Sequence, residues 1–187
     1  MERDSRRVSG DDIVGNMKPN FALTLSAEGI GLLHRVPSGW HVVGKVGFDA
    51  PDLTTILAEL YGFALRLEPK GVISKLVIPN EQVKYLSVTV QSSDPAQQEV
   101  QAQQALDGAT PYAVGDLAYD WSVEDGQLLI AAVARETLLE AEAFARDHRF
   151  NPVSFVATPD AGSFLGEPFF GTAPCAEMEA ESSGAIL

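Results

Sequence analysis

Side chains able to act as nucleophiles or metal ligands are few and scattered in this sequence. The three histidines, His34, His41 and His148, never occur in the H-x-x-x-H or H-E-x-x-H spacing that puts two metal ligands on one helix face. Asp147 stands beside His148, but no serine or cysteine elbow accompanies this pair. The histidines therefore read as structural residues, and the sequence predicts no catalytic residue and no metal site.

Nucleotide-binding motifs are also missing. A P-loop needs G-x-x-x-x-G-K-[ST] after a strand, and a dinucleotide fold needs G-x-G-x-x-G, and the sequence contains neither. The segment "AEGIGLL" has only Gly29-Ile30-Gly31, which favours a tight turn over a phosphate loop. The guanine motif N-K-x-D is absent too, so a GTPase such as translation initiation factor 2 is not supported.

Composition and charge narrow the class of protein. Of the 187 residues, 45% are hydrophobic and 21% are charged, and the net charge is −13. An acidic chain is a poor match for nucleic acid, whose phosphates need a basic surface. No apolar run approaches the roughly 18 residues of a membrane span. The single cysteine, Cys175, excludes an intramolecular disulfide, and we expect a cytoplasmic protein without direct membrane insertion.

The first half of the chain changes from strand to helix patterning. Three short apolar runs separated by turn signals predict an antiparallel meander over residues 20–26, 29–35 and 40–47. Apolar residues then recur at helical spacing from Leu53 to Ala64. The segment "VISKLVIPN" predicts a strand that returns parallel to the meander, because it follows a crossover helix.

The second half follows the order strand, helix, strand, strand, helix, strand. The strand "VKYLSVTV" precedes a helix that starts at Asp94 and stops at Gly108. The strands "LAYDWSV" and "QLLIAAVA" flank a hairpin turn at residues 124–126. In the next helix we expect Leu139 and Ala143 among the inward-facing residues, and "NPVSFVA" is the last predicted strand.

These patterns predict a mixed α/β fold of two subdomains. The predicted division is a disordered extension at 1–19, a βββαβ subdomain at 20–81, an inserted strand-helix-strand-strand-helix subdomain at 82–149, a return strand at 150–160 and a flexible acidic tail or linker at 161–187.

The order of these segments resembles that of a known family. A helix leads through the proline turn of "GATPYAVGDLAYDW" into a strand with an acidic-aromatic pair. A hairpin, an apolar strand and a helix follow in "DGQLLIAAVARETLLEAEAFARDHRFNP", and "KLVIPNEQVKYLSVTV" supplies a strand-proline-strand passage upstream. Over roughly residues 20–160 this is similar to the PilM and GspL cytoplasmic domains, the actin-like platform proteins of type IV pilus and type II secretion systems. The resemblance implies a partial actin-like fold of ribonuclease-H-like topology.

PilM-like members of that family bind ATP at an acidic "D-I-G-S-S" hairpin after the first strand. At the comparable positions this chain has Thr24 for the aspartate, Ser26 for the first glycine and Gly31 for a lysine. Without the carboxylate a metal–ATP site loses its usual anchor. The resemblance therefore implies a degenerate loop and no bound cofactor.

Three hypotheses about function follow. The first is a non-catalytic scaffold that binds a peptide of an inner-membrane or envelope protein, with Tyr112, Tyr119 and Trp121 in a groove between the subdomains. Aromatics at strand spacing are also typical of a core or a subdomain interface. The second is an ATP-dependent switch with an altered loop, and the third is a small-molecule-binding domain with a closed apolar pocket. The resemblance also implies a location at the cytoplasmic face of the inner membrane.

Overall fold

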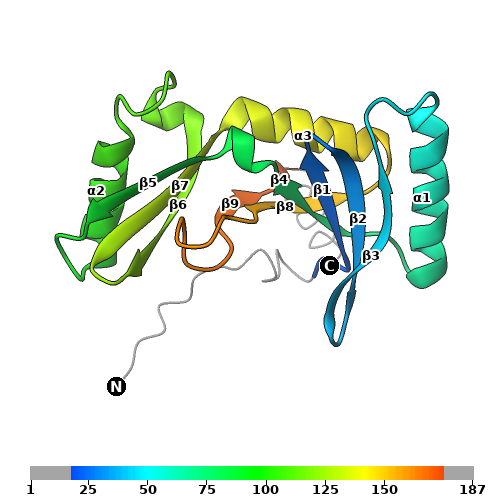
Figure 1. Cartoon of the computed structure of the whole chain (residues 1–187), viewed down its shortest axis with the longest axis horizontal. Coiled ribbons are helices and arrows are strands. Elements are labelled where there is room, and N and C mark those ends of the chain that lie inside the picture. The colour runs from blue at the N-terminus through cyan, green and yellow to red at the C-terminus, as the bar shows by residue number, and fades with distance from the viewer. Residues whose placement is uncertain (1–17, 175–187) are drawn as a thin grey trace, which may run out of the picture.

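The computed structural model describes residues 18–174, which form two β-sheets and three α-helices (Figure 1). The six-stranded sheet has the order β3-β2-β1-β4-β8-β9, and the three-stranded sheet has the order β5-β7-β6. The strands are β1 (Phe21–Ser26), β2 (Gly29–Val36), β3 (Gly39–Val46), β4 (Ser74–Ile78), β5 (Lys84–Thr89), β6 (Leu117–Glu124), β7 (Gln127–Ala134), β8 (Pro152–Ala157) and β9 (Phe169–Thr172), and the helices are α1 (Leu53–Leu67), α2 (Pro95–Leu106) and α3 (Arg135–Asp147), with 3₁₀ turns η1 (Asn80–Gln82) and η2 (Val114–Asp116).

The first half of the chain forms the predicted meander and crossover. Strands β1, β2 and β3 pair antiparallel, and β4 returns parallel to β1. The Asp52 side chain caps α1 by accepting the N–H of Thr55 at 3.2 Å. Leu57, Leu60 and Ala64 form the buried stripe that packs this helix against the sheet. These predictions are confirmed.

The three-stranded sheet is built around the β6–β7 hairpin. Asp125 and Gly126 both have positive φ, 47° and 76°, as a two-residue type I′ turn requires. Helix α2 covers one face of this sheet with Ala102 and Leu106, which pack beside Leu128 in a small second core. The predicted hairpin and the helix before it are confirmed.

Helix α3 lies along both sheets and contacts β4, β7 and β8 (Figure 1). Leu138, Ala141 and Ala145 form its buried stripe. The expectation that Leu139 and Ala143 face inward is wrong, because Leu139 is 58% exposed and Ala143 is exposed as well. At about 100° per residue, both side chains lie more than a quarter-turn from Leu138, outside the narrow stripe that the sheets cover.

Strand β9 was not expected. Residues 161–187 are predicted as a flexible tail, yet β9 pairs antiparallel with β8 and Phe170 is buried. A four-residue strand that contains a glycine has no measurable periodicity, so only its partner strand reveals it. Residues 1–17 and 175–187, and with them Cys175, lie outside the described residues.

One apolar cluster connects the two sheets. Leu76 and Phe155 of the six-stranded sheet belong to the same buried cluster as Leu129, Ala131 and Val133 of β7. The segment predicted as an inserted subdomain therefore shares its core with the rest of the chain.

Candidate functional site

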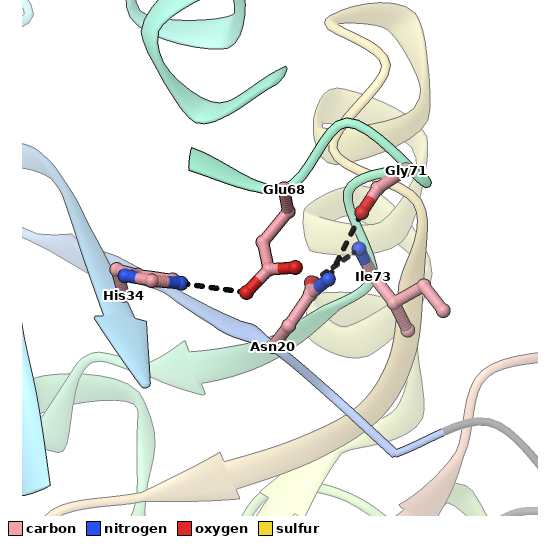
Figure 2. A network of polar contacts seen from close by, with 5 residues as sticks. All are labelled: Asn20, His34, Glu68, Gly71 and Ile73. Carbon is pink, nitrogen blue, oxygen red and sulfur yellow. Dashed lines mark hydrogen bonds and ion pairs between the residues drawn. The ribbon is translucent and has the colours of Figure 1, made fainter. Parts of the chain in front are cut away.

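A network of polar contacts connects the end of α1 and the loop after it to the start of the six-stranded sheet (Figure 2). The Asn20 side chain donates from Nδ2 to the carbonyl of Gly71 at 2.9 Å and accepts the N–H of Ile73 at 2.8 Å. Beside it, Nε2 of His34 lies 2.8 Å from Oε1 of Glu68. These contacts hold backbone segments together, which is the structural role that the sequence favours for this histidine.

The groove next to Tyr112 is one candidate for ligand binding. Its volume is about 360 Å³, and it lies between η1, the start of β5, the loop before β6 and the end of β7. Tyr112 is 43% exposed on its rim. Pro111 and Ala109 line it beside Tyr112, so it offers backbone and apolar surface, with Glu81 and Lys84 as the charged residues.

Tyr119 and Trp121 lie together at a second hollow, between β6 and β9. This hollow has a volume of about 390 Å³, and Glu99 of α2 also lines it. The two rings are 6.3 Å apart between centroids, and both are half-buried. The Tyr119 hydroxyl accepts a 2.7 Å hydrogen bond from Nε2 of Gln103, which ties the ring to α2.

The three aromatic residues predicted to share a groove line two different hollows. Tyr112 is on the rim of the first, and Tyr119 and Trp121 are in the second. Both of the latter also pack against the small core under α2, as aromatics at strand spacing often do. Of the three side chains, that of Tyr112 has the largest exposed fraction, 43%, whereas the other two are half-buried.

The β1–β2 hairpin brings Thr24, Ser26 and Gly31 together at a third hollow of about 180 Å³, beside Lys45. The Thr24 hydroxyl donates to the carbonyl of Gly31, and that of Ser26 donates to the carbonyl of Gly29, both at 3.3 Å. A Cβ atom on Gly31 would meet Oγ1 of Thr24 at 2.5 Å. Packing within the hairpin thus accounts for the glycine and for both hydroxyl donors.

One titratable group at the junction of the sheets has a strongly shifted pKa. Burial, and then the nearby charge of Asp160, raises the pKa of Tyr85 to about 12. Its hydroxyl donates to Oδ1 of Asn80 at 2.8 Å, so the neutral form is the one that the structure uses. The hydrogen bond to Asn80 gives the hydroxyl of this tyrosine a structural partner.

The sequence does not predict an ion pair that joins a buried lysine to a partly exposed glutamate. Lys75 of β4 is only 3% exposed, and its Nζ lies 2.9 and 2.8 Å from the two carboxylate oxygens of Glu167. The sequence around either residue gives no sign of the other, because the two are 92 positions apart in the chain.

Among residues 18–174, no group of three or more histidine, cysteine or acidic side chains is placed to hold a metal ion. In the same part of the chain, no helix has the length and apolar character needed to cross a membrane.

Comparison with known proteins gives structural matches only. No protein family matches the chain, and neither does any curated protein sequence. The cytoplasmic domain of EpsL, an inner membrane component of the type II secretion system of Vibrio cholerae, has a similar structure, with a TM-score of 0.54 and 15% identity over 76% of this chain. A chain of the PilM–PilN type IV pilus biogenesis complex has a TM-score of 0.53 and 12% identity over 71% of this chain.

These likenesses define the fold class. The chain has a mixed α/β fold similar to that of the EpsL domain and of the matched chain in the PilM–PilN complex, which confirms the predicted mixed α/β class. It spans 60% of the EpsL domain and 45% of the matched chain of the PilM–PilN complex.

Proposed function

We propose that this protein is a non-catalytic scaffold domain that binds an extended segment of a partner protein in an assembly of the secretion or pilus type. The observation that carries the proposal is the open groove beside Tyr112, which has a volume of about 360 Å³ and a large exposed aromatic side chain on its rim. An extended peptide binds through backbone contacts and apolar pockets, so a site of this kind needs no reactive side chain.

The fold supports the same proposal. Two proteins that share it are a cytoplasmic domain of an inner membrane component and a chain of a two-protein pilus complex. By analogy, the partner is an inner-membrane or envelope protein, and this domain lies at the cytoplasmic face of that membrane. In this proposal residues 20–81 with 150–160 form one subdomain and residues 82–149 form the other, and the groove follows their junction.

A photo-crosslinking residue at position 112 tests the proposal in cells. We expect crosslinks to a peptide of an envelope protein, and no crosslink from the same residue at Phe63, which is 53% exposed on α1. The mapped peptide should then bind the purified full chain, and Tyr112→Ala should weaken binding at least about tenfold, as is usual for an aromatic anchor. A peptide that binds wild type and Tyr112→Ala equally would contradict the proposed site.

An ATP-binding switch is the second candidate, because the hollow at the β1–β2 hairpin holds Thr24 and Ser26 beside the cationic Lys45. Calorimetric titration with ATP and Mg²⁺ separates the two functions. The scaffold hypothesis predicts no heat of binding. Binding of ATP with a micromolar dissociation constant, lost in Thr24→Ala, would instead support the ATP-binding switch and contradict the scaffold hypothesis. A small-molecule function has less support, since these three hollows are open grooves and not closed pockets.

A further inference from the structure

Residues 163–172, here called the strap, join the two sheets near their junction. After β8 the chain reverses and the strap returns along it, ending in β9 (Figure 1). On its other side, the N–H of Leu165 donates to Oγ of Ser122 at 3.1 Å, and the N–H of Phe169 donates to Oδ2 of Asp120 at 3.0 Å. Strand β6 thus holds the strap with side chains, whereas β8 holds it by backbone pairing.

An ion pair connects the middle of the strap to the centre of the six-stranded sheet. Both carboxylate oxygens of Glu167 accept hydrogen bonds from Nζ of Lys75, and the Lys75 side chain is 4% exposed, against 31% for Glu167. The ammonium also lies 4.8 Å from the ring centroid of Trp40. A buried ammonium is unfavourable without a charged partner, whereas a partly exposed carboxylate keeps some hydration. Glu167 of the strap therefore supplies the charged partner that the buried ammonium of Lys75 requires.

The rest of the strap is held by two buried aromatic side chains and a short backbone ladder. Phe164 and Phe170 are each 5% exposed in the main core, but Leu165 between the anchors is 46% exposed. The backbone ladder to β8 has three residue pairs and is interrupted by a register shift. The C-terminal part of the strap also forms one wall of the hollow that contains Tyr119 and Trp121.

We propose that the strap is a clamp that opens and closes as one unit, and that the Lys75–Glu167 ion pair holds it closed. Closed, it fixes the three-stranded sheet against the six-stranded sheet and covers the edge of β8, which would otherwise be open to pairing with another strand. Open, it frees that edge and widens the hollow at Tyr119 and Trp121. The consequence for partner binding rests on the proposed function, whereas the clamp itself does not.

Hydrogen exchange of individual amides in the full chain, measured by NMR without any partner, tests the clamp. We expect Glu167→Gln to speed exchange at Leu165 and Phe169 by the same factor, on the order of 10- to 100-fold, because charge-assisted hydrogen bonds are lost. Amides of the β2–β3 hairpin should keep their rates. The matched control is Glu59→Gln, which removes an exposed carboxylate from α1 and should change neither group.

Lys75→Met provides an independent second variant, because it removes the buried charge while keeping a similar side-chain length. We expect faster exchange of the strap here as well, and a double variant that is no faster than the faster single variant, since both changes break one contact. Unchanged exchange in the strap, additive effects in the double variant, or an equal acceleration across the whole chain would each overturn the proposal. None of these outcomes depends on whether a peptide binds at Tyr112.

Discussion

The hydroxyl of Tyr85 donates a 2.8 Å hydrogen bond to Oδ1 of Asn80, and Nδ2 of that asparagine donates a 2.7 Å hydrogen bond to the carbonyl of Thr158. Asn80 and Tyr85 lie where the chain leaves the six-stranded sheet through η1 and enters β5, and Thr158 directly follows β8. These two hydrogen bonds join β5 to the end of β8 and so connect the two sheets at one end of their junction. The strap connects the sheets at another place.

Stability at high pH should depend on Tyr85. Its pKa is about 12 in the folded protein, against 10.0 for a tyrosine that is neither buried nor close to Asp160. The unfolded chain therefore loses this proton first, and its free energy falls relative to the folded state as the pH rises from about 10 to 12. The stabilisation is fully present below pH 10.

We expect urea denaturation of Tyr85→Phe to show a shallower decline in the free energy of unfolding over this range than wild type shows. Tyr112→Phe, which alters an exposed tyrosine, should decline as wild type does. Parallel curves for wild type and Tyr85→Phe would show that the raised pKa of Tyr85 does not contribute.

The Asn20 side chain should stabilise the loop between α1 and β4 (Figure 2). Asn20→Ala removes the acceptor for Ile73 and the donor for Gly71, and we expect a loss of about 2 kcal/mol in the free energy of unfolding. Asn20→Asp keeps an acceptor for Ile73 but no donor, so it should fall between alanine and wild type. Thermal and urea denaturation measure both, and a wild-type stability for Asn20→Ala would contradict the role of this network.

The hairpin at the third hollow should tolerate no side chain at Gly29. Gly29 and Gly39 have similar positive φ angles, 132° and 128°, so an alanine is strained at either position. A Cβ atom on Gly29 would lie 2.1 Å from the carbonyl oxygen of Val46, whereas nothing lies within 4 Å of one on Gly39. We expect Gly29→Ala to be less stable than Gly39→Ala by about 1 to 3 kcal/mol in urea. Equal losses would assign the whole effect to backbone strain.

Phe150 should be among the largest single contributors to the main core. It is fully buried just before β8, and its ring meets that of Tyr61 edge-on, with centroids 6.0 Å apart. Phe150→Ala should lower the free energy of unfolding by about 3 to 5 kcal/mol. Phe63→Ala, on the exposed side of α1, should lower it by less than about 1 kcal/mol. Similar losses for the two would contradict the placement of Phe150.

Local signals explain why most elements could be predicted. The helical spacing from Leu53 to Ala64 places one stripe on the sheet, and the turn at Asp125-Gly126 needs φ angles that few other pairs adopt. Strand β9 has neither kind of signal. It forms only by pairing with β8, whose residues lie more than ten positions away in the chain. The sequence of α3 predicts Leu139 on the inward face, but this residue is exposed, because a helix sequence does not say how wide a stripe its neighbours will cover.

The candidate site could be predicted only in part. Tyr112 lies exposed on a groove, but Tyr119 and Trp121 line another hollow, because a turn and the 3₁₀ segment η2 separate the first residue from β6. Thr24, Ser26 and Gly31 share one hollow, as residues close together in a hairpin must. The tertiary contact between β6 and the strap, made through Asp120, could not have been foreseen from alternation along one strand.

The sequence by itself determined the order of strands and helices up to residue 157, because hydrophobic period, caps and turn residues act over a few positions. Only the tertiary structure decided that a lysine in β4 is buried and that a glutamate 92 residues later neutralises it. From the sequence alone, Lys75 is expected to face solvent, because burying its charge is unfavourable unless a carboxylate lies close to it. Long-range contacts of the same kind place residues 163–172, part of the segment predicted as a flexible tail, between the two sheets.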